Sequence, residues 1–367
     1  MRLRSLFAAV AVGALVLGIA ACGGGNKSSG TAKTGPKGGS ISGAGATFPQ
    51  PVYEEWASRF KDLYGTTVNY NPIGSGGGIA QFTAGTVDFG ASDAAMKPEE
   101  IAAAKKKGDP VRVPTVFGAI TVSYNVSGLD KGLKLDGPTI ADVFLGKIKK
   151  WNDPALAKLN PGTKLPDKAI TIVHRSDESG TTKLFTSFLD KQSPQWHKQV
   201  GSDKTVKWPT GTGAKGNDGV AGAVKQTDGA VGYVEEAYAL QNNFTTADVK
   251  NKAGQYVAPS LQSTTAAGEG LTVPADLRFS AINASSNPQA YPIASATFLL
   301  VYQDMCKPGV AKDKAVRVWN WLNYAVGKGQ TVAPSLQYAP LPAALDQKAK
   351  AKVDGLVCDG SPLKGQT

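Results

Sequence analysis

The segment VNYNPIGSGGGIAQFTAGTVDFGASD, residues 68–93, shows the alternation of strand-like and helix-like residue patterns that recurs along the chain. Its β-prone and helically spaced apolar residues predict a strand over 66–70, a helix over 79–84 after a glycine cluster, and a second strand over 87–91. A helix between two strands lets the chain return to the same end of a sheet, so that the strands run parallel. The segment therefore predicts an α/β fold.

The same alternation of helices and strands continues on both sides of this segment. Apolar residues at helical spacing predict helices over 52–63, 98–107, 139–145, 181–190, 220–226 and 316–324. Runs of β-prone residues predict strands over 111–126, 169–174, 230–234 and 294–302. The chain has 367 residues, enough for two domains of ordinary size. We expect an α/β fold with a largely parallel sheet in each domain.

The N-terminus has the features of a signal peptide over residues 1–21. Two arginines precede an apolar run that ends in Ile-Ala-Ala before Cys22. This ending is similar to a bacterial lipobox, which predicts that Cys22 is lipidated and anchors the exported protein on the outer face of the cell membrane. A cleaved signal peptide with an incidental cysteine is the alternative. Residues 22–40, rich in Gly, Ser, Lys and Thr, predict a flexible tether.

Two cysteines, Cys306 and Cys358, remain when Cys22 is set aside. In an oxidising compartment a remaining pair is usually bonded, so we expect a disulfide that ties the C-terminal tail to the body. His174 and His197 are the only histidines, and neither has a close Cys/His spacing. The sequence therefore predicts no metal site and no cofactor.

The chain is basic, with a formal net charge of +11. This charge suits an anionic partner, but it equally suits the neighbourhood of an anionic cell envelope. The basic residues are scattered, and no basic run alternates with stacking aromatic residues, which argues against nucleic acid as the partner.

Two loops combine glycine with a hydroxyl side chain just before a predicted helix, where unpaired backbone N–H groups favour an oxyanion. GAGATFP at 43–49 contains Thr47 and Phe48, and IGSGGGI at 73–79 contains Ser75. Taken alone, the first loop is more typical of an ordinary helix N-cap, and the second is a weak signal for a ligand.

A third loop, HRSDESGTT from residue 174, adds a cation. Its predicted helix start holds Ser179, Gly180 and Thr181. Arg175 offers a planar fork that matches two oxyanion oxygens, and Asp177 could hold that fork in place. The alternative is a surface Arg–Asp pair beside an ordinary helix cap.

Asp93 follows the strand predicted over 87–91, at the end of a strand where α/β folds bind ligands. A carboxylate should repel an anion there, unless the ligand carries a proton that it can donate. A solvated loop carboxylate is the alternative, and it holds unless the three loops converge nearby.

These segments together resemble the phosphate-binding proteins of phosphate-specific ABC transporters. The matching stretches are, in order, GAGATFPQPVYEEW, VNYNPIGSGGGIAQFTAGTVDFGASDA, LGKIKKWNDPALAKLNPG, HRSDESGTT, TVKWPTGTGAKGNDGVAG, GAVGYVEEAYA and YPIASATF. They run from residue 43 to about 300, and the ordered set is far more specific than any one motif.

The resemblance implies a two-lobed periplasmic-binding-protein fold, with crossings between the lobes near Asn125 and Pro292. Residues 41–124 and 293–367 would form the first lobe, and 125–292 the second. The implied function is capture of inorganic phosphate, without a cofactor, by a monomer that delivers it to the permease subunits and ATPase of an ABC importer.

The resemblance also implies the ligand residues. Those of the first lobe would be Thr47, Phe48, Ser75 and Asp93, and those of the second Arg175, Ser179, Gly180 and Thr181. Asp177 would orient Arg175. Glu178 stands where the family often has glycine, and we expect its side chain to point to solvent.

Other functions remain open at this point. An exported phosphatase would need a base beside Ser179, and His174 should point away from it if the strand alternates as predicted. A surface adhesin or signalling lipoprotein could use the same fold. Sulfate is the alternative ligand of the same shape.

Overall fold

The computed structural model describes residues 38–129 and 132–365. The predicted signal peptide over 1–21 and the lipidation site Cys22 lie outside the described residues, as does most of the predicted tether. The first strand, β1, begins at Ser40. In the part of the chain that is described, no helix is both long and apolar enough to cross a membrane.

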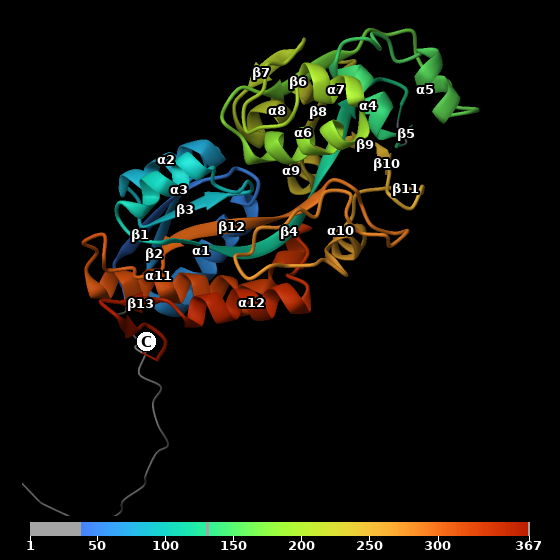
Figure 1. The fold of residues 1–367 in the computed structure, drawn as a ribbon. Coiled ribbons are helices and arrows are strands. Elements are labelled where there is room, and N and C mark those ends of the chain that lie inside the picture. The colour runs from blue at the N-terminus through green and yellow to red at the C-terminus, as the bar shows by residue number, and fades with distance from the viewer. Residues whose placement is uncertain (1–37, 130–131, 366–367) are drawn as a thin grey trace, which may run out of the picture. The chain divides into compact units, whose positions relative to one another are not determined.

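A nine-stranded sheet forms the centre of the fold (Figure 1). Its strand order is β2 (Thr67–Asn71), β1 (Ser40–Gly45), β3 (Phe89–Ser92), β12 (Ala294–Tyr302), β4 (Pro110–Asn125), β8 (Ala230–Glu235), β6 (Thr171–Arg175) and β7 (Thr212–Ala214), and β9 (Thr245–Thr246) pairs with β4 outside this order. We call β1, β2, β3 and β12 the first strand group, and β6, β7 and β8 the second strand group.

The pairing is parallel within each group except at β12. β1 is parallel to β2 and β3, and β6 is parallel to β7 and β8. β12 is antiparallel to β3 and β4, and β4 is antiparallel to β8. β4 leads from the first group to the second and β12 leads back, so these two strands must run in opposite directions. The α/β class is confirmed, and the pairing is parallel in each group apart from the two connecting strands, β4 and β12.

β4 belongs to both strand groups. Its first part pairs with β12 as far as Ala119, and its second part pairs with β8 from Ile120 onward. The boundary expected at 124/125 lies beyond this change of partner. Nearly the whole strand is buried, which is why its sequence is a long apolar run without alternation.

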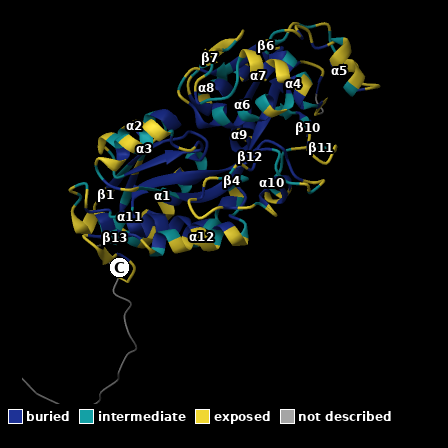
Figure 2. Cartoon of the chain, viewed as in Figure 1, coloured by how far each residue is buried: buried dark blue, intermediate teal, exposed yellow. Residues whose placement is uncertain are grey.

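Helices pack around both strand groups, and their outer faces carry exposed residues (Figure 2). Those at the first group are α1 (Gln50–Tyr64), α2 (Ser75–Ala84), α3 (Pro98–Lys105), α11 (Lys312–Ala325) and α12 (Ala343–Asp354). Those at the second are α4 (Gly137–Phe144), α6 (Gly180–Gln192), α8 (Gly216–Gln226) and α9 (Glu236–Gln241). The helices predicted from apolar spacing are all present.

The apolar face of α1 shows why these helices form. Tyr53, Trp56 and Phe60 recur at helical spacing and are fully buried. All three rings lie within 6.2 Å of the Trp321 ring on α11, measured between centroids. Trp56 also donates its indole N–H to the Gly329 carbonyl at 2.9 Å, so its polar atom is satisfied in the core.

The elements that the sequence patterns do not predict are mostly short. They are α5 (Pro154–Leu159), α7 (Pro194–Gln199), α10 (Leu261–Gly268), β5 (Lys134–Leu135), β10 (Asp248–Lys250), β11 (Tyr256–Val257), β13 (Val357–Cys358), β14 (Ser361–Pro362) and the 3-10 turns η1 (Lys328–Thr331) and η2 (Ala333–Leu336). The strands β1, β7 and β9 and the helices α9 and α12 are also absent from the predicted set.

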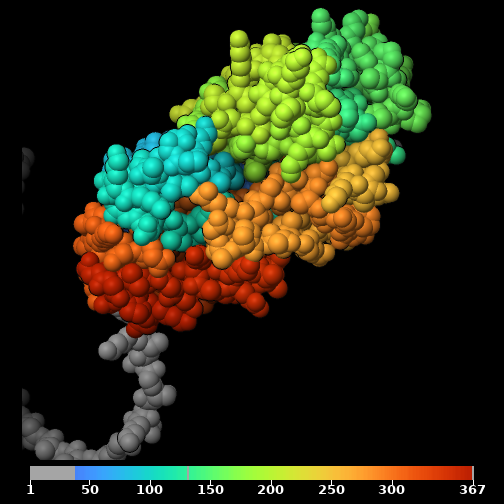
Figure 3. All heavy atoms as spheres, in the orientation of Figure 1, coloured from blue at the N-terminus to red at the C-terminus, as the bar shows by residue number. Residues whose placement is uncertain are grey.

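The segment between α10 and β12 packs on the first strand group. Phe279 lies against Phe298 and Phe117, with ring centroids 6.0 and 6.4 Å away. Lys348 of α12 donates a hydrogen bond to the Val273 carbonyl. Figure 3 shows the orange residues of this segment directly against the red residues of α12. These contacts join the segment to residues of β4, β12 and α12.

Cys306 and Cys358 form the expected disulfide across a sequence separation of 52. The bond ties β13 to the segment that follows β12. Among the described residues, the one cluster of Cys, His or carboxylate side chains close enough to share a metal is Cys306, Cys358 and Asp359. Both of its sulfur atoms are used in the disulfide.

Replacing Cys306 and Cys358 together by serine should lower the free energy of unfolding by ~2–4 kcal/mol, because the bond no longer restricts the unfolded chain. Urea unfolding measures this loss, and reduced wild-type protein is the control that should show the same loss. Alkylation of unfolded, unreduced wild type should label neither cysteine. Labelling of both would contradict the disulfide.

Candidate oxyanion site

The three predicted loops meet where β1, β3 and β6 end. The Gly74 N–H donates to the Gly45 carbonyl at 2.8 Å, which joins the first two loops. The Gly76 N–H donates to the Glu178 carbonyl at 2.9 Å, which joins the second loop to the third. The C-terminal ends of the strands thus bring together segments that lie far apart in sequence.

Gly180, at the start of α6, lies very close to residues of the first loops. A Cβ atom at this position would lie 2.3 Å from Ser75 Oγ and 2.6 Å from Asp93 Oδ2. Only glycine fits there, because real Cβ atoms do not approach other heavy atoms so closely. The start of α6 therefore faces the hydroxyl of α2 and the carboxyl group after β3 directly.

Asp93 is buried, with 3% of its surface exposed. Its Oδ1 accepts a hydrogen bond from the Thr297 hydroxyl at 2.7 Å, and its N–H donates to Ser75 Oγ at 3.2 Å. Burial raises the pKa of Asp93 to about 7, although the Thr297 hydrogen bond and the Arg175 charge act in the opposite direction. Oδ2 is the oxygen that faces Gly180. The site thus contains a carboxyl group that titrates near neutral pH.

Arg175, the last residue of β6, is also buried. Its Nε donates to Asp177 Oδ1 at 2.7 Å, and its Nη2 pairs with Asp177 Oδ2. Burial alone would raise the pKa of Asp177, but the Arg175 guanidinium holds it below its ordinary value. Nη1 is buried and has no hydrogen-bond partner among the residues that the structure describes. One donor of the fork is therefore left for a ligand.

The N-terminus of α6 carries hydroxyl groups whose protons are free to donate. Ser179 is the N-cap, and its Oγ accepts from the Thr182 N–H at 3.0 Å. Thr181 Oγ1 accepts from Asn217 Nδ2 at 3.3 Å. Both hydroxyls act as acceptors in these bonds, so each keeps its own proton for an anion. The first N–H groups of the helix point the same way.

Thr47 contributes another hydroxyl group that accepts hydrogen bonds and keeps its own proton free to donate. Its Oγ1 accepts from the backbone N–H of Asn217 at 3.2 Å and from Asn217 Nδ2 at 2.8 Å. The Phe48 side chain is fully buried in the core, with its ring 6.3 Å from the Tyr338 ring between centroids, and its carbonyl accepts from the Tyr338 hydroxyl at 2.7 Å. The side chain of Phe48 is thus a core group, and only its backbone can serve a ligand.

Asn217 and Thr297 are the residues of this site that sequence reasoning missed. Asn217, fully buried at the start of α8, contacts both Thr47 and Thr181 and accepts the Glu235 N–H at 3.0 Å. It follows a glycine shortly before the helix predicted over 220–226, as in the other loops, but it carries an amide group where those loops carry a hydroxyl group. Thr297 lies in YPIASATF, one of the stretches that carry the family resemblance, but its local pattern is that of an ordinary strand residue and indicates no ligand role.

Charged contacts join the two strand groups at the edge of the site. Lys204 is buried, and its Nζ pairs with Glu100 of α3 and lies 3.0 Å from Glu178 Oε1. Lys97 Nζ lies 2.7 Å from Asp203 Oδ2. The Glu178 side chain is 47% exposed and directed at Lys204. Its extra charge is thus matched by a cation.

His174 lies away from the hydroxyl groups. Its ring stacks on Trp208 with centroids 4.7 Å apart, and its Nδ1 lies 3.1 Å from the Arg175 carbonyl. Burial lowers the pKa of His174. Ser179 Oγ accepts a hydrogen bond from the Thr182 N–H, and in the described part of the chain no hydrogen bond joins Ser179 to His174.

A family model described as a PBP superfamily domain matches residues 30–326. The chain is 44% identical over 88% of its length to "Phosphate-binding protein PstS" of Pasteurella multocida, covering 93% of that protein. It is 34% identical over 97% of its length to "Phosphate-binding protein PstS 3" of Mycobacterium leprae, covering all of that protein.

Solved structures show the same fold. A high affinity periplasmic phosphate-binding protein, PfluDING, solved with bound phosphate, matches with a TM-score of 0.68 at 23% identity, over 85% of this chain and 93% of that one. A putative phosphate ABC transporter substrate-binding protein from Clostridium perfringens matches with a TM-score of 0.60 at 17% identity, over 83% of this chain and all of that one.

These matches confirm the α/β periplasmic-binding-protein fold that the ordered motifs imply. The relatives are binding proteins by name, in agreement with the expectation that the chain is not an enzyme. With 44% identity over most of both chains, this protein belongs to the PstS family of phosphate-binding proteins.

Proposed function

We propose that this chain captures inorganic phosphate outside the cell membrane and delivers it to an ABC phosphate importer. The observation that carries the proposal is Arg175 Nη1, a buried donor without a partner among the described residues, at a site that also holds Asp93. Leaving such a donor unpaired costs free energy, which a bound oxyanion would remove. The names of the relatives indicate phosphate as that oxyanion.

The proposed ligand residues come from both strand groups: Thr47, Phe48 through its backbone, Ser75, Asp93, Arg175, Ser179, Gly180 and Thr181. Asp177 orients Arg175 through its two carboxylate oxygens. Neutral donors and one guanidinium replace the water around the anion, and Asp93 accepts its proton. No cofactor or metal takes part in this scheme.

We infer that the strand groups are the centres of two lobes that close on the ligand. Neither group alone supplies enough donors, so binding and closure are coupled. The change of pairing partner between Ala119 and Ile120 supports a first crossing there, earlier than at Asn125. The contacts of Phe279 with Phe298 support a second crossing before residue 279, earlier than at Pro292.

Calorimetric titration with phosphate and sulfate tests the proposed ligand. At about pH 9, where Asp93 with its pKa of about 7 is ionised, phosphate should bind one per chain and sulfate should bind far more weakly. Hydrolysis of a chromogenic phosphate ester with added divalent metal tests the alternative of an exported phosphatase, and we expect no turnover. Binding of neither anion would contradict the proposal.

We also propose that Cys22 is lipidated and holds a monomer beside the permease subunits and their ATPase. The support is the lipobox-like ending of residues 19–22 after an apolar run. Cys22→Ser should abolish the lipid and move the protein to the aqueous phase. Detergent partitioning and intact mass measure both effects, and a wild-type chain without a lipid mass increment would contradict the anchor.

A further inference from the structure

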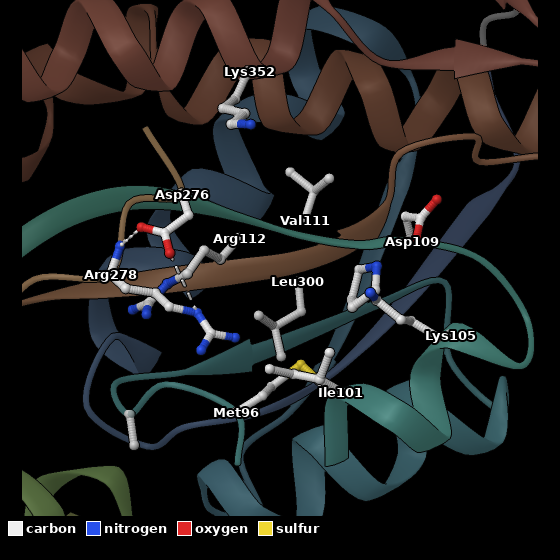
Figure 4. A pocket seen from close by; sticks show the side chains of 12 residues that line it. Met96, Ile101, Lys105, Asp109, Val111, Arg112, Asp276, Arg278, Leu300 and Lys352 are labelled. Atoms are coloured by element: carbon white, nitrogen blue, oxygen red, sulfur yellow. Dashed lines mark hydrogen bonds and ion pairs between the residues drawn. The ribbon is translucent and has the colours of Figure 1, made fainter. Parts of the chain in front are cut away.

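We propose a second binding site, for a small organic anion that carries an apolar group, in a cavity of about 330 Å³ beside the first strand group (Figure 4). α3, β4, β12, α12 and the loop at 276–278 contribute to its wall. None of the proposed phosphate ligands lines it, although Ala94, which does, directly follows Asp93. The cavity is therefore a separate site next to the proposed phosphate site.

Cations dominate the polar part of this wall. Four basic side chains, from Lys105, Arg112, Arg278 and Lys352, face the cavity together with the carboxylates of Asp109 and Asp276. Asp276 is already engaged, because its Oδ1 accepts the Arg278 N–H at 3.0 Å and its Oδ2 lies 3.9 Å from Arg278 Nε. Across residues 38–129 and 132–365, no ion pair involves Lys105, Arg112 or Lys352. The wall thus has a surplus of positive charge.

Arg112 is the most constrained of these cations. Its Nε is buried and finds no hydrogen-bond partner within the described parts of the chain. Its guanidinium carbon lies 3.5 Å from the centroid of the Phe298 ring, a contact that compensates only part of the lost hydration. Burial and the nearby Arg278 charge lower the pKa of Arg112 to about 9. An anion would supply the missing counter-charge and acceptor.

The remainder of the wall is apolar. Met96, Ile101, Val111 and Leu300 line it, and Met96 and Leu300 belong to a small hydrophobic cluster under α3. An inorganic anion would leave these side chains against water, whereas an apolar group would cover them. The volume is at the lower end of the range for ligand pockets, so the occupant is a small molecule. Cations and apolar wall together favour an aromatic or short aliphatic carboxylate, sulfonate or phosphate ester.

Two fluorescent probes test this site on the full chain. The first is 8-anilino-1-naphthalenesulfonate, and the second is N-phenyl-1-naphthylamine, which has the same ring system without the sulfonate. The charged probe should bind one per chain and more tightly than the neutral one, and saturating phosphate should not displace it. Equal affinity for the two probes, or displacement by phosphate, would overturn the proposal.

Single substitutions test whether the charged probe binds in this cavity. Arg112→Met should weaken the charged probe about tenfold or more and leave phosphate affinity within about twofold. Lys105→Glu should also weaken binding of the charged probe. Lys106→Glu makes the same charge change at the next exposed residue and should leave this binding unchanged, because Lys106 does not line the cavity. The lysine pair keeps the test informative if Arg112→Met does not fold. Unchanged affinity in Lys105→Glu, or an equal loss in Lys106→Glu, would overturn the site.

Discussion

Arg175→Ala should weaken phosphate binding by a factor of roughly 30 to several thousand, because it removes a charge-assisted contact from a buried site, at a typical cost of ~2–5 kcal/mol. The unpaired Nη1 of Arg175 is the donor that the ligand would lose. Titration calorimetry with phosphate measures the change. Arg175→Lys should recover only part of the loss, since an ammonium group keeps the charge but not the planar fork.

The variant should also be less stable, because Asp177 loses the cation that lowers its pKa. Asp177 keeps its hydrogen bond from the Gly216 N–H at 3.1 Å, so we expect the fold to survive. Circular dichroism and thermal unfolding check this. Arg59→Ala is the matched control, since Arg59 is an exposed arginine paired with Glu55 on α1. Phosphate binding by Arg175→Ala within about twofold of wild type would exclude Arg175 as a ligand.

The local chemistry of the helix starts could be predicted from the sequence. Ser179 was expected at the start of a helix after a strand, and it is the N-cap of α6. Ser75 was expected between a strand and a helix, and it is the first residue of α2. Both predictions depend on glycine and hydroxyl residues beside an apolar pattern, which are properties of a few consecutive residues.

The convergence of these loops could not be derived from local patterns. Gly180 lies against Ser75 and Asp93 only because β4 and β12 join the strand groups, and this join depends on pairing between distant residues. The resemblance to a known family implied the convergence, whereas periodicity did not. Helix α12 was missed for another reason: its buried residues Leu345, Ala349 and Val353 stand among polar neighbours, so its apolar signal is weak.

Asp93→Asn should narrow the difference between phosphate and sulfate affinity. Phosphate carries at least one O–H near neutral pH, and ionised Asp93 can accept it, whereas sulfate would set an oxygen lone pair against the carboxylate. A site built around one hydrogen bond can reject the analogue that lacks it by ~10⁴–10⁵. The Thr297 hydroxyl already donates to Oδ1, so the amide nitrogen of asparagine would replace Oδ2, which faces Gly180. That nitrogen can donate to either anion.

Because burial raises the pKa of Asp93, the preference for phosphate over sulfate should also depend on pH. Above its pKa of about 7, Asp93 is ionised and excludes sulfate; below it, the protonated carboxyl group can itself donate to sulfate. Sulfate affinity of the wild type should therefore fall by about tenfold per pH unit above this value, since one proton must be taken up on binding. In Asp93→Asn this dependence should disappear, and in Asp62→Asn, an exposed carboxylate on α1, it should remain. Titrations with both anions, at fixed salt and between about pH 6 and 9, measure this dependence. A wild-type sulfate affinity that is independent of pH would show that Asp93 does not select the ligand by its proton.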